Sequence, residues 1–366
     1  MSANPDSLSA TPRLTEPPLR RGRTFTVHRG RLPGGEPVIC KTASGRSWSA
    51  DAVARLENEF AITRGRTHPG QTVARDLIHT DRGPMLIFED EGLRSLDGAA
   101  LPLGPGAVTR IALALAPIFA DLHGVQGIIH RDIKPSNVLA DRAFERVKLI
   151  DYCLAIRAAD LAAEQPGAFA AKGTVAYMAP EQSGRTNRQV DWRADLYSLG
   201  AMLYELLTGR PPFPEGDAAT LFHRHLTEVP RPPNEVRSEI PRVLSDAVMR
   251  LLAKNPEDRF QSAAELARAL QGGGPAVVAA PGRLRIPTRL YGRETLVTEL
   301  TELVGDPAGG RSRLLRIAGQ SGIGKSALLT PVRAAVEAGG GHFIHGKFDQ
   351  LDRARPYAPF AQAFNA

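Results

Sequence analysis

The chain has 366 residues, of which 42% are hydrophobic, and its 46 Lys and Arg residues outnumber 39 Asp and Glu residues to give a formal net charge of +7. This composition excludes wholesale disorder, and the length suits two domains. A charge of this size over this length favours a solvated, arginine-rich surface over a nucleic-acid-binding protein. The only cysteines are Cys40 and Cys153, which excludes a disulfide framework or a zinc cluster and favours a reducing, cytoplasmic compartment.

The first 20 residues are polar and rich in proline. They lack the apolar centre of a signal peptide, so no signal peptide is predicted. Their polar, proline-rich composition predicts a flexible tail. No apolar run reaches the roughly 18 residues of a membrane-spanning helix. The most apolar stretch, residues 111–122, contains Pro117 and Asp121 and is predicted to be a buried helix, so no membrane segment is expected.

A small strand-rich region is predicted to come first. Strands with a turn at residues 33–35 are expected between residues 24 and 41, followed by an amphipathic helix over 50–64 and an apolar strand over 85–88. Helical periodicity then dominates, at residues 108–123, 193–208, 243–253 and 262–270. The fold is therefore predicted to be α+β, with a small β-rich lobe before a larger helical lobe.

A glycine-rich linker is predicted from residue 272 to residue 288, and a second unit follows it. That unit contains an apolar strand at 314–318 and then a motif of the form Gly-x-x-x-x-Gly-Lys-Ser, which cradles phosphate groups in P-loop proteins. The residues expected to bind nucleotide there are Gly319, Gly322, Gly324, Lys325 and Ser326. Because a P-loop domain needs a multi-stranded parallel sheet and only two strands are predicted, an incomplete α/β domain is expected.

Residues 130–137 read His-Arg-Asp-Ile-Lys-Pro-Ser-Asn, an order that neither helix nor strand periodicity requires. Further segments stand in a fixed order around it: Val38-Ile39-Cys40-Lys41, Asp151-Tyr152-Cys153, Ala179-Pro180-Glu181, Asp195 and Arg259. Together they resemble the signature set of the protein kinases over residues 20 to 270. The resemblance implies a bilobal protein-kinase fold and transfer of the ATP γ-phosphate to a protein hydroxyl.

The resemblance implies that Lys41 clamps the α- and β-phosphates of ATP. A carboxylate must hold this lysine, and the helix over 50–64 offers Glu59 as the best candidate and Glu57 as a rival. Residues two apart on a helix point in different directions, so only one of them can face Lys41. The other expected nucleotide contacts are Gly22, Val27 and the hinge residues Glu89 and Glu91.

The catalytic loop carries the remaining implied roles. Asp132 accepts or orients the proton of the substrate hydroxyl, and Lys134 neutralises the γ-phosphate in the manner typical of serine/threonine kinases. Thr174 is expected to hydrogen-bond near both of these residues. Asn137 and Asp151 are expected to bind Mg²⁺ through hard oxygen atoms.

Two departures from the kinase pattern leave an alternative open. Gly22 is the only glycine in residues 19–27, where the family has three, and Cys153 replaces the glycine of Asp-Phe-Gly, which removes easy access to positive φ. Every charged catalytic position is nevertheless present, so an active kinase is the leading hypothesis. The alternatives are a pseudokinase module that regulates an attached ATPase, and a P-loop ATPase whose N-terminal domain is only regulatory.

The activation segment contains few hydroxyl groups. Between Leu154 and Ala179 only Thr174 and Tyr177 carry one, and the family uses both positions structurally. No ordinary activation-loop phosphosite is therefore expected.

Residues 173–188, 291–294 and 346–350 make the resemblance more specific. They are similar to large bacterial signalling proteins that combine a serine/threonine kinase, an AAA/STAND ATPase and often a sensor histidine kinase. The implied organisation is a tail over 1–20, a protein kinase domain over 21–271, a linker over 272–288 and a partial ATPase domain over 289–366. Expected partners are ATP, a protein substrate with Ser or Thr, and further signalling domains towards the C-terminus.

Overall fold

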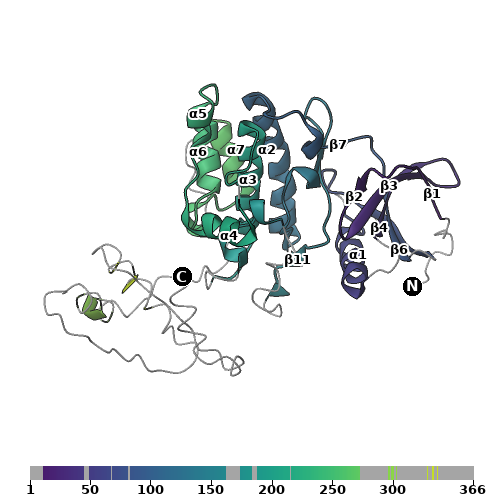
Figure 1. Ribbon diagram of the computed structural model, residues 1–366, viewed down its shortest axis with the longest axis horizontal. Coiled ribbons are helices and arrows are strands. Elements are labelled where there is room, and N and C mark those ends of the chain that lie inside the picture. Colours follow the sequence, from purple (N-terminus) through teal and green to yellow (C-terminus); the bar gives the residue numbers. More distant parts are fainter. Residues whose placement is uncertain are drawn as a thin grey trace. The chain divides into compact units, whose positions relative to one another are not determined.

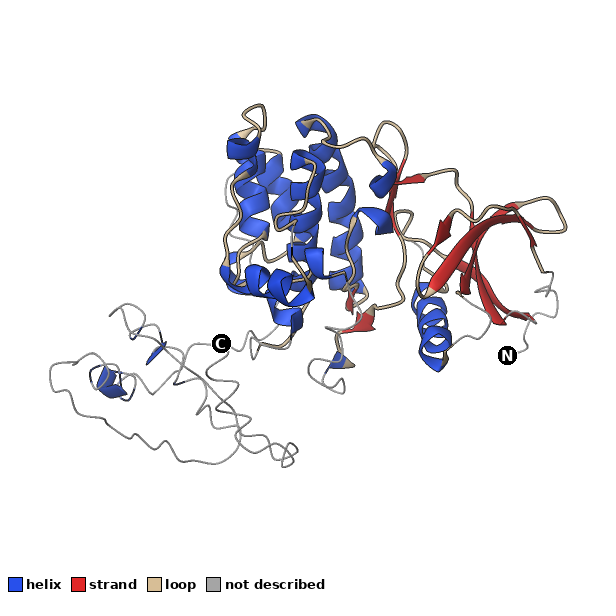
Figure 2. Ribbon diagram, viewed as in Figure 1, coloured by secondary structure: helices blue, strands red, loops and turns tan. Residues whose placement is uncertain are grey.

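The computed structural model describes residues 11–44, 49–66, 68–80, 83–161, 174–183, 188–214 and 216–272, with a few positions between 296 and 336. The chain divides into two compact units, residues 1–277 and 278–366. In the first unit a strand-rich lobe is followed by a helical lobe, as Figures 1 and 2 show. The α+β fold class predicted from the sequence is therefore observed.

The strand-rich lobe is built on one antiparallel sheet with the strand order β1-β3-β4-β6-β5, and β2 also pairs with β3. Helix α1 (Ala50–Thr63) packs Leu56 against Leu86 and Phe88 of this sheet. The helix begins at Ser49, whose side chain accepts a hydrogen bond from Ala52 N. The strands are β1 (Arg13–Leu14), β2 (Arg20–Arg21), β3 (Phe25–Arg31), β4 (Pro37–Ala43), β5 (Ala74–Thr80) and β6 (Gly83–Glu89).

The prediction of a flexible tail over residues 1–20 is wrong for the part that the structure describes. Leu14 pairs with Gly30 of β3, and Thr15 N donates to Arg29 O at 2.7 Å. The Leu14 side chain also packs against the apolar cluster that contains Cys40 and Met85. Two paired residues are too few to produce a detectable alternation in sequence, which explains why the strand was not predicted.

The helical lobe surrounds α3, whose residues are almost all buried. The helix predicted over residues 193–208 is observed with these bounds as α3. The helix predicted over residues 108–123 instead begins at Pro105 and continues after Phe119 as a π-helix to Val125. Helix α4 was not predicted. The helices are α2 (Pro105–Phe119), η2 (Ala120–Val125), α3 (Arg193–Thr208), α4 (Ala218–Thr227), α5 (Pro233–Val236), α6 (Arg242–Leu251) and α7 (Ala263–Leu270).

Short elements connect these helices and carry the segments that are predicted to be catalytic. Strands β7, β9 and β10 form one small sheet, and β8 pairs with β11 in another. The strands are β7 (Arg94–Ser95), β8 (Ile128–Ile129), β9 (Val138–Ala140), β10 (Val147–Leu149) and β11 (Ile156–Arg157). The short helices are η1 (Leu96–Gly98), η3 (Pro135–Asn137), η5 (Val175–Tyr177), η6 (Pro180–Ser183) and η7 (Pro256–Asp258).

Among the described helices, the continuous segment Pro105–Val125 is the one with the length and composition to cross a membrane. Its side chains Ile111, Leu115, Phe119 and Leu122 are buried in the core that the helical lobe builds around α3. This packing explains the apolar character of the segment, in agreement with the predicted buried helix.

In the second unit, Leu300, Leu328 and Val332 are buried together against Val336. The predicted strand at 314–318 and the P-loop residues 319–326 lie outside the described residues.

A buried ion pair joins the end of the activation segment to the last part of the helical lobe. Arg259 is fully buried and donates to both carboxylate oxygens of Glu181, at 2.6 and 2.8 Å. Its other guanidinium hydrogens go to the carbonyl oxygens of Arg193, Lys254 and Ala253. Every donor of the guanidinium thus has an acceptor, which offsets the cost of burying the charge.

Replacing Arg259 by alanine would leave the Glu181 carboxylate buried without a counterion. We expect Arg259→Ala to lower the free energy of unfolding by about 3–5 kcal/mol, measured by urea denaturation. The matched control is Arg242→Ala, which removes an exposed pair with Asp246 on α6 and is expected to leave the urea midpoint unchanged. Equal effects of the two substitutions would contradict this interpretation.

Candidate active site

The catalytic loop follows β8 and is held by the first turn of α3. The carboxylate of Asp195 is fully buried and accepts hydrogen bonds from His130 N at 2.8 Å and Arg131 N at 2.7 Å. It also contacts His123 Nε2 at 2.9 Å. Burial alone would raise the pKa of Asp195, but the hydrogen bond from His123 lowers it below its ordinary value, so the carboxylate remains charged.

Four side chains predicted for the catalytic loop and activation segment lie together. Lys134 Nζ is 2.6 Å from Asp132 Oδ2 and 2.8 Å from Thr174 Oγ1. Asn137 Nδ2 donates to Asp132 Oδ2 at 3.0 Å and to its carbonyl oxygen at 2.8 Å. One oxygen of the Asp132 carboxylate, Oδ2, is therefore held by both an ammonium group and an amide.

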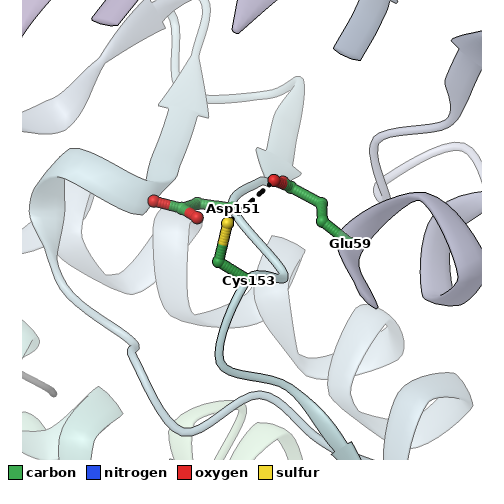
Figure 3. Close-up of side chains that lie close together, drawn as sticks. All are labelled: Glu59, Asp151 and Cys153. Atoms are coloured by element: carbon green, nitrogen blue, oxygen red, sulfur yellow. Dashed lines mark hydrogen bonds between the residues drawn. The ribbon is translucent and has the colours of Figure 1, made fainter. Parts of the chain in front are cut away.

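The structure brings Lys41 of β4 to Glu59 of α1 rather than to Glu57, which is exposed. Lys41 Nζ lies 2.7 Å from Glu59 Oε2 and 2.7 Å from Asp151 Oδ1. It also lies 3.1 Å from the sulfur of Cys153. We call these four residues the lysine cluster; Figure 3 shows its acidic and sulfur-bearing members.

The ionisation of the lysine cluster follows from these contacts. Burial alone would lower the pKa of Lys41, but the charges of Asp151 and Glu59 raise it well above its ordinary value. For Asp151, burial alone would raise the pKa, and the ammonium groups of Lys41 and Lys134 instead lower it below its ordinary range. Lys41 and Asp151 are therefore both charged at neutral pH.

Glu59, Asp151 and Cys153 place potential metal-ligating atoms within 4.8 Å of one another. The ammonium nitrogen of Lys41 already lies 2.7–3.1 Å from all three residues. A metal ion in this position would have to displace the lysine. The cluster is therefore a site for the lysine cation rather than for a resident metal.

Asn137 and Asp151 fit a divalent cation better. Strands β9 and β10 pair antiparallel, and Ile150 N donates to Asn137 O at 3.0 Å, so the two residues lie at the same end of this pair. The amide nitrogen of Asn137 is engaged by Asp132, which leaves Oδ1 as its ligand atom. The Asp151 side chain is 31% exposed, and Lys41 contacts only its Oδ1. Two hard oxygen donors are thus available, which suits Mg²⁺.

The residues predicted to contact nucleotide from the strand-rich lobe lie in different surroundings from one another. Val27 lies opposite Lys41 in the pairing of β3 with β4. Gly22 forms a tight turn in which its N–H donates to Phe25 O at 2.8 Å, and a Cβ there would come within 2.9 Å of that oxygen. Glu89 is exposed at the end of β6, whereas the carboxylate of Glu91 pairs with Arg146 and Lys148.

Phe25 is a contact of the lysine cluster that the sequence did not predict. Its ring centroid lies 4.8 Å from Lys41 Nζ, a distance typical of a cation–π contact. The alternation of β3 places Phe25 on the same face as Val27, so this periodicity could have indicated it.

Tyr152 occupies the phenylalanine position of the kinase motif. Its N–H donates to Glu59 Oε1 at 3.1 Å, and its ring packs 4.7 Å from that of His130. The side chain is fully buried, and its hydroxyl has no hydrogen-bond partner among the described residues. The guanidinium of Arg66 lies over the ring, 5.3 Å from its centroid.

Comparison with known proteins agrees with this geometry. Residues 19–269 match the family described as protein kinase domain. The chain belongs to the protein kinase family. Residues 289–366 match the AAA ATPase domain. The predicted combination of a kinase domain with a following AAA ATPase domain is confirmed.

Bacterial serine/threonine-protein kinases are among the similar proteins. Pkn1 of Myxococcus xanthus is 40% identical over 264 residues, which are 69% of this chain and 37% of Pkn1. PkaA of Streptomyces coelicolor is 35% identical over 282 residues, 70% of this chain and 49% of PkaA. PknB of Mycobacterium leprae is 43% identical over 222 residues, 58% of this chain and 34% of PknB. The chain thus aligns with less than half the length of each relative.

The buried hydroxyl of Tyr152 predicts an unusual effect on stability. Removing an unsatisfied buried hydroxyl relieves a desolvation cost, so Tyr152→Phe is expected to raise the free energy of unfolding by about 1 kcal/mol in urea denaturation. Tyr197 is the matched control, because it is equally buried and its hydroxyl lies 2.8 Å from His225 Nδ1. Tyr197→Phe should lower stability, and a loss of stability in Tyr152→Phe would mean that its hydroxyl is satisfied.

Proposed function

We propose that the kinase domain of this chain transfers the γ-phosphate of ATP to serine or threonine hydroxyls of a protein substrate. The observation that carries the proposal is the position of Lys41, held 2.7 Å from both Glu59 and Asp151. This contact joins the phosphate-binding lysine, the helix carboxylate and a metal-binding carboxylate. Phosphoryl transfer depends on such positioning and on charge neutralisation.

The remaining residues take roles that follow from their contacts. Asp132 orients the substrate hydroxyl and accepts its proton, since its carboxylate is held by Lys134 at 2.6 Å and by Asn137 at 3.0 Å. Lys134 Nζ and Thr174 Oγ1 lie 2.8 Å apart, so both would contact the transferred phosphate. Asn137 Oδ1 and Asp151 would hold Mg²⁺, which neutralises phosphate charge when it is bound.

The choice of serine and threonine rests on Lys134 and on the names of the relatives. Lysine at this position resembles serine/threonine kinases, and Pkn1, PkaA and PknB are named as such. We also propose a cytoplasmic location for the reaction. The two free thiols of Cys40 and Cys153, both buried, support a reducing compartment.

Residues 19–27, which contain a single glycine, support a second hypothesis, in which the domain regulates an attached ATPase without transferring phosphate. Gly22 is used by the turn before β3, so the backbone there is less free to cover phosphates than a loop with three glycines. A measurement of phosphate transfer by the full chain separates the two hypotheses, because only the active kinase transfers phosphate.

The decisive experiment compares the full chain with Asp132→Asn in the presence of labelled ATP, Mg²⁺ and a general protein substrate. We expect the substitution to lower the rate about 100-fold or more, because the proton acceptor is lost. Asp97→Asn, at an exposed position, is the control and should keep full activity. Phosphoamino acid analysis should give phosphoserine and phosphothreonine, and chelation of Mg²⁺ should abolish the label. Equal background label in wild type and Asp132→Asn would refute the kinase function.

Activity is expected to be independent of phosphorylation in the activation segment. Residues 154–173 contain no serine, threonine or tyrosine, so no added phosphate can order this part through new charge-assisted contacts. Phosphatase treatment of the purified protein should change kcat by less than about twofold, since the contacts of Lys41 are made without a phosphate group. A loss of most of the activity, with Thr174 as the modified residue, would contradict this expectation.

A further inference from the structure

Cys153 contacts both members of the Lys41–Glu59 pair. Its sulfur lies 3.1 Å from Lys41 Nζ and 3.1 Å from Glu59 Oε2, and Figure 3 shows the sulfur pointing at the Glu59 carboxylate. The residue is only 6% exposed. A thiol has one S–H donor and weak acceptor lone pairs, so Cys153 can donate to Glu59 and accept from Lys41 at the same time.

The thiol therefore connects two groups that come from different elements. Its sulfur lies at hydrogen-bond distance from the Glu59 carboxylate of α1 and from the Lys41 ammonium of β4. It acts as a hydrogen-bonded bridge between them.

All three N–H donors of the Lys41 ammonium have acceptors in the lysine cluster. Two go to the carboxylates of Glu59 and Asp151 at 2.7 Å, and one goes to the sulfur of Cys153 at 3.1 Å. Sulfur is the weakest of these acceptors, so an incoming phosphate oxygen replaces it at the least cost. The S–H bond to Glu59 uses the thiol hydrogen, whereas the contact with Lys41 uses a sulfur lone pair.

Neighbouring contacts attach α1 to the same short segment. Asn58 Nδ2 donates to Ala155 O at 3.0 Å, and Tyr152 N donates to Glu59 Oε1 at 3.1 Å. The thiol of Cys153 adds a contact to the second oxygen of the same carboxylate. The side chains of Asn58 and Glu59 thus tie α1 to residues 152–155, and residues 154–173 contain no serine, threonine or tyrosine whose phosphorylation could order this part of the chain.

We propose that Cys153 is a positioning residue of the kinase reaction, whose thiol holds Glu59, and through it Lys41, in the arrangement that receives the phosphates of ATP. Glycine at this position would remove one donor to Glu59 and one acceptor of Lys41. The inference rests on the proposed function, since it assigns Cys153 a part in phosphate transfer.

A double-mutant cycle on the full chain tests this role. Cys153→Ala is expected to lower kcat about five- to tenfold, an effect within the range of losing one ordinary intramolecular hydrogen bond. Cys153→Ser can still donate and accept, so it should stay within about twofold of wild type. In a Glu59→Gln background, Cys153→Ala should lower kcat by less than about twofold, because the group through which the thiol acts is already altered.

Cys40 supplies the matched control. It is the other buried cysteine, and it packs in the apolar cluster with Val38 and Met85. Cys40→Ala is expected to lower the thermal midpoint and to leave kcat unchanged. If Cys153 had only a packing role, Cys153→Ala would show this same pattern, and the proposal would be overturned.

An equal effect of Cys153→Ala on kcat in the wild-type and Glu59→Gln backgrounds would also overturn the proposal. If the wild-type chain transfers no phosphate, the same cycle is read from the Kd of Mg²⁺–ADP, measured by calorimetry. A loss of affinity in Cys153→Ala that vanishes in the Glu59→Gln background would support the positioning role although the kinase function fails. Equal affinities, or no binding by the wild type, would reject the positioning role as well.

Discussion

The arrangement of the active site depends on one buried carboxylate, that of Asp195. Its hydrogen bonds to the backbone N–H groups of His130 and Arg131 hold Arg131 in the left-handed region, with φ of 68°. This conformation is unfavourable for a residue with a side chain, so it persists only where the surroundings impose it. Because α3 is buried in the helical core, the position of Asp132 is set by the packing of the whole lobe.

Charge balance connects this loop to the strand-rich lobe. Glu59 and Asp151 face a single ammonium group in the lysine cluster, and Lys134 adds a second positive charge that also lowers the pKa of Asp151. Buried charges are tolerated only where each one is paired and hydrogen-bonded. Lys41 meets this requirement with groups from β4, α1 and the start of the activation segment, so one cation fixes three segments that are distant in sequence.

The charged segments could be predicted from the sequence because their residue order has no explanation in helix or strand periodicity. Helical geometry also predicts that only one of Glu57 and Glu59 can face Lys41, because residues two apart on a helix point in different directions. The contact of Cys153 with Lys41 could not be predicted, because Asp151, two residues earlier, adopts a left-handed backbone conformation with φ of 66°. Strand β5 and helix α4 were missed because tertiary packing, rather than a clear local pattern, determines them.

Strands β1 and β2 give the basic composition of the chain a structural meaning. They run along the side of β3 that β4 does not occupy, and each is only two residues long. Their arginines, Arg13, Arg20 and Arg21, are all exposed. Short edge strands with positively charged side chains discourage the pairing of one sheet with another. Strands β1 and β2 therefore disfavour the pairing of another strand at this edge of the sheet, and their three arginines give part of the basic composition a structural role.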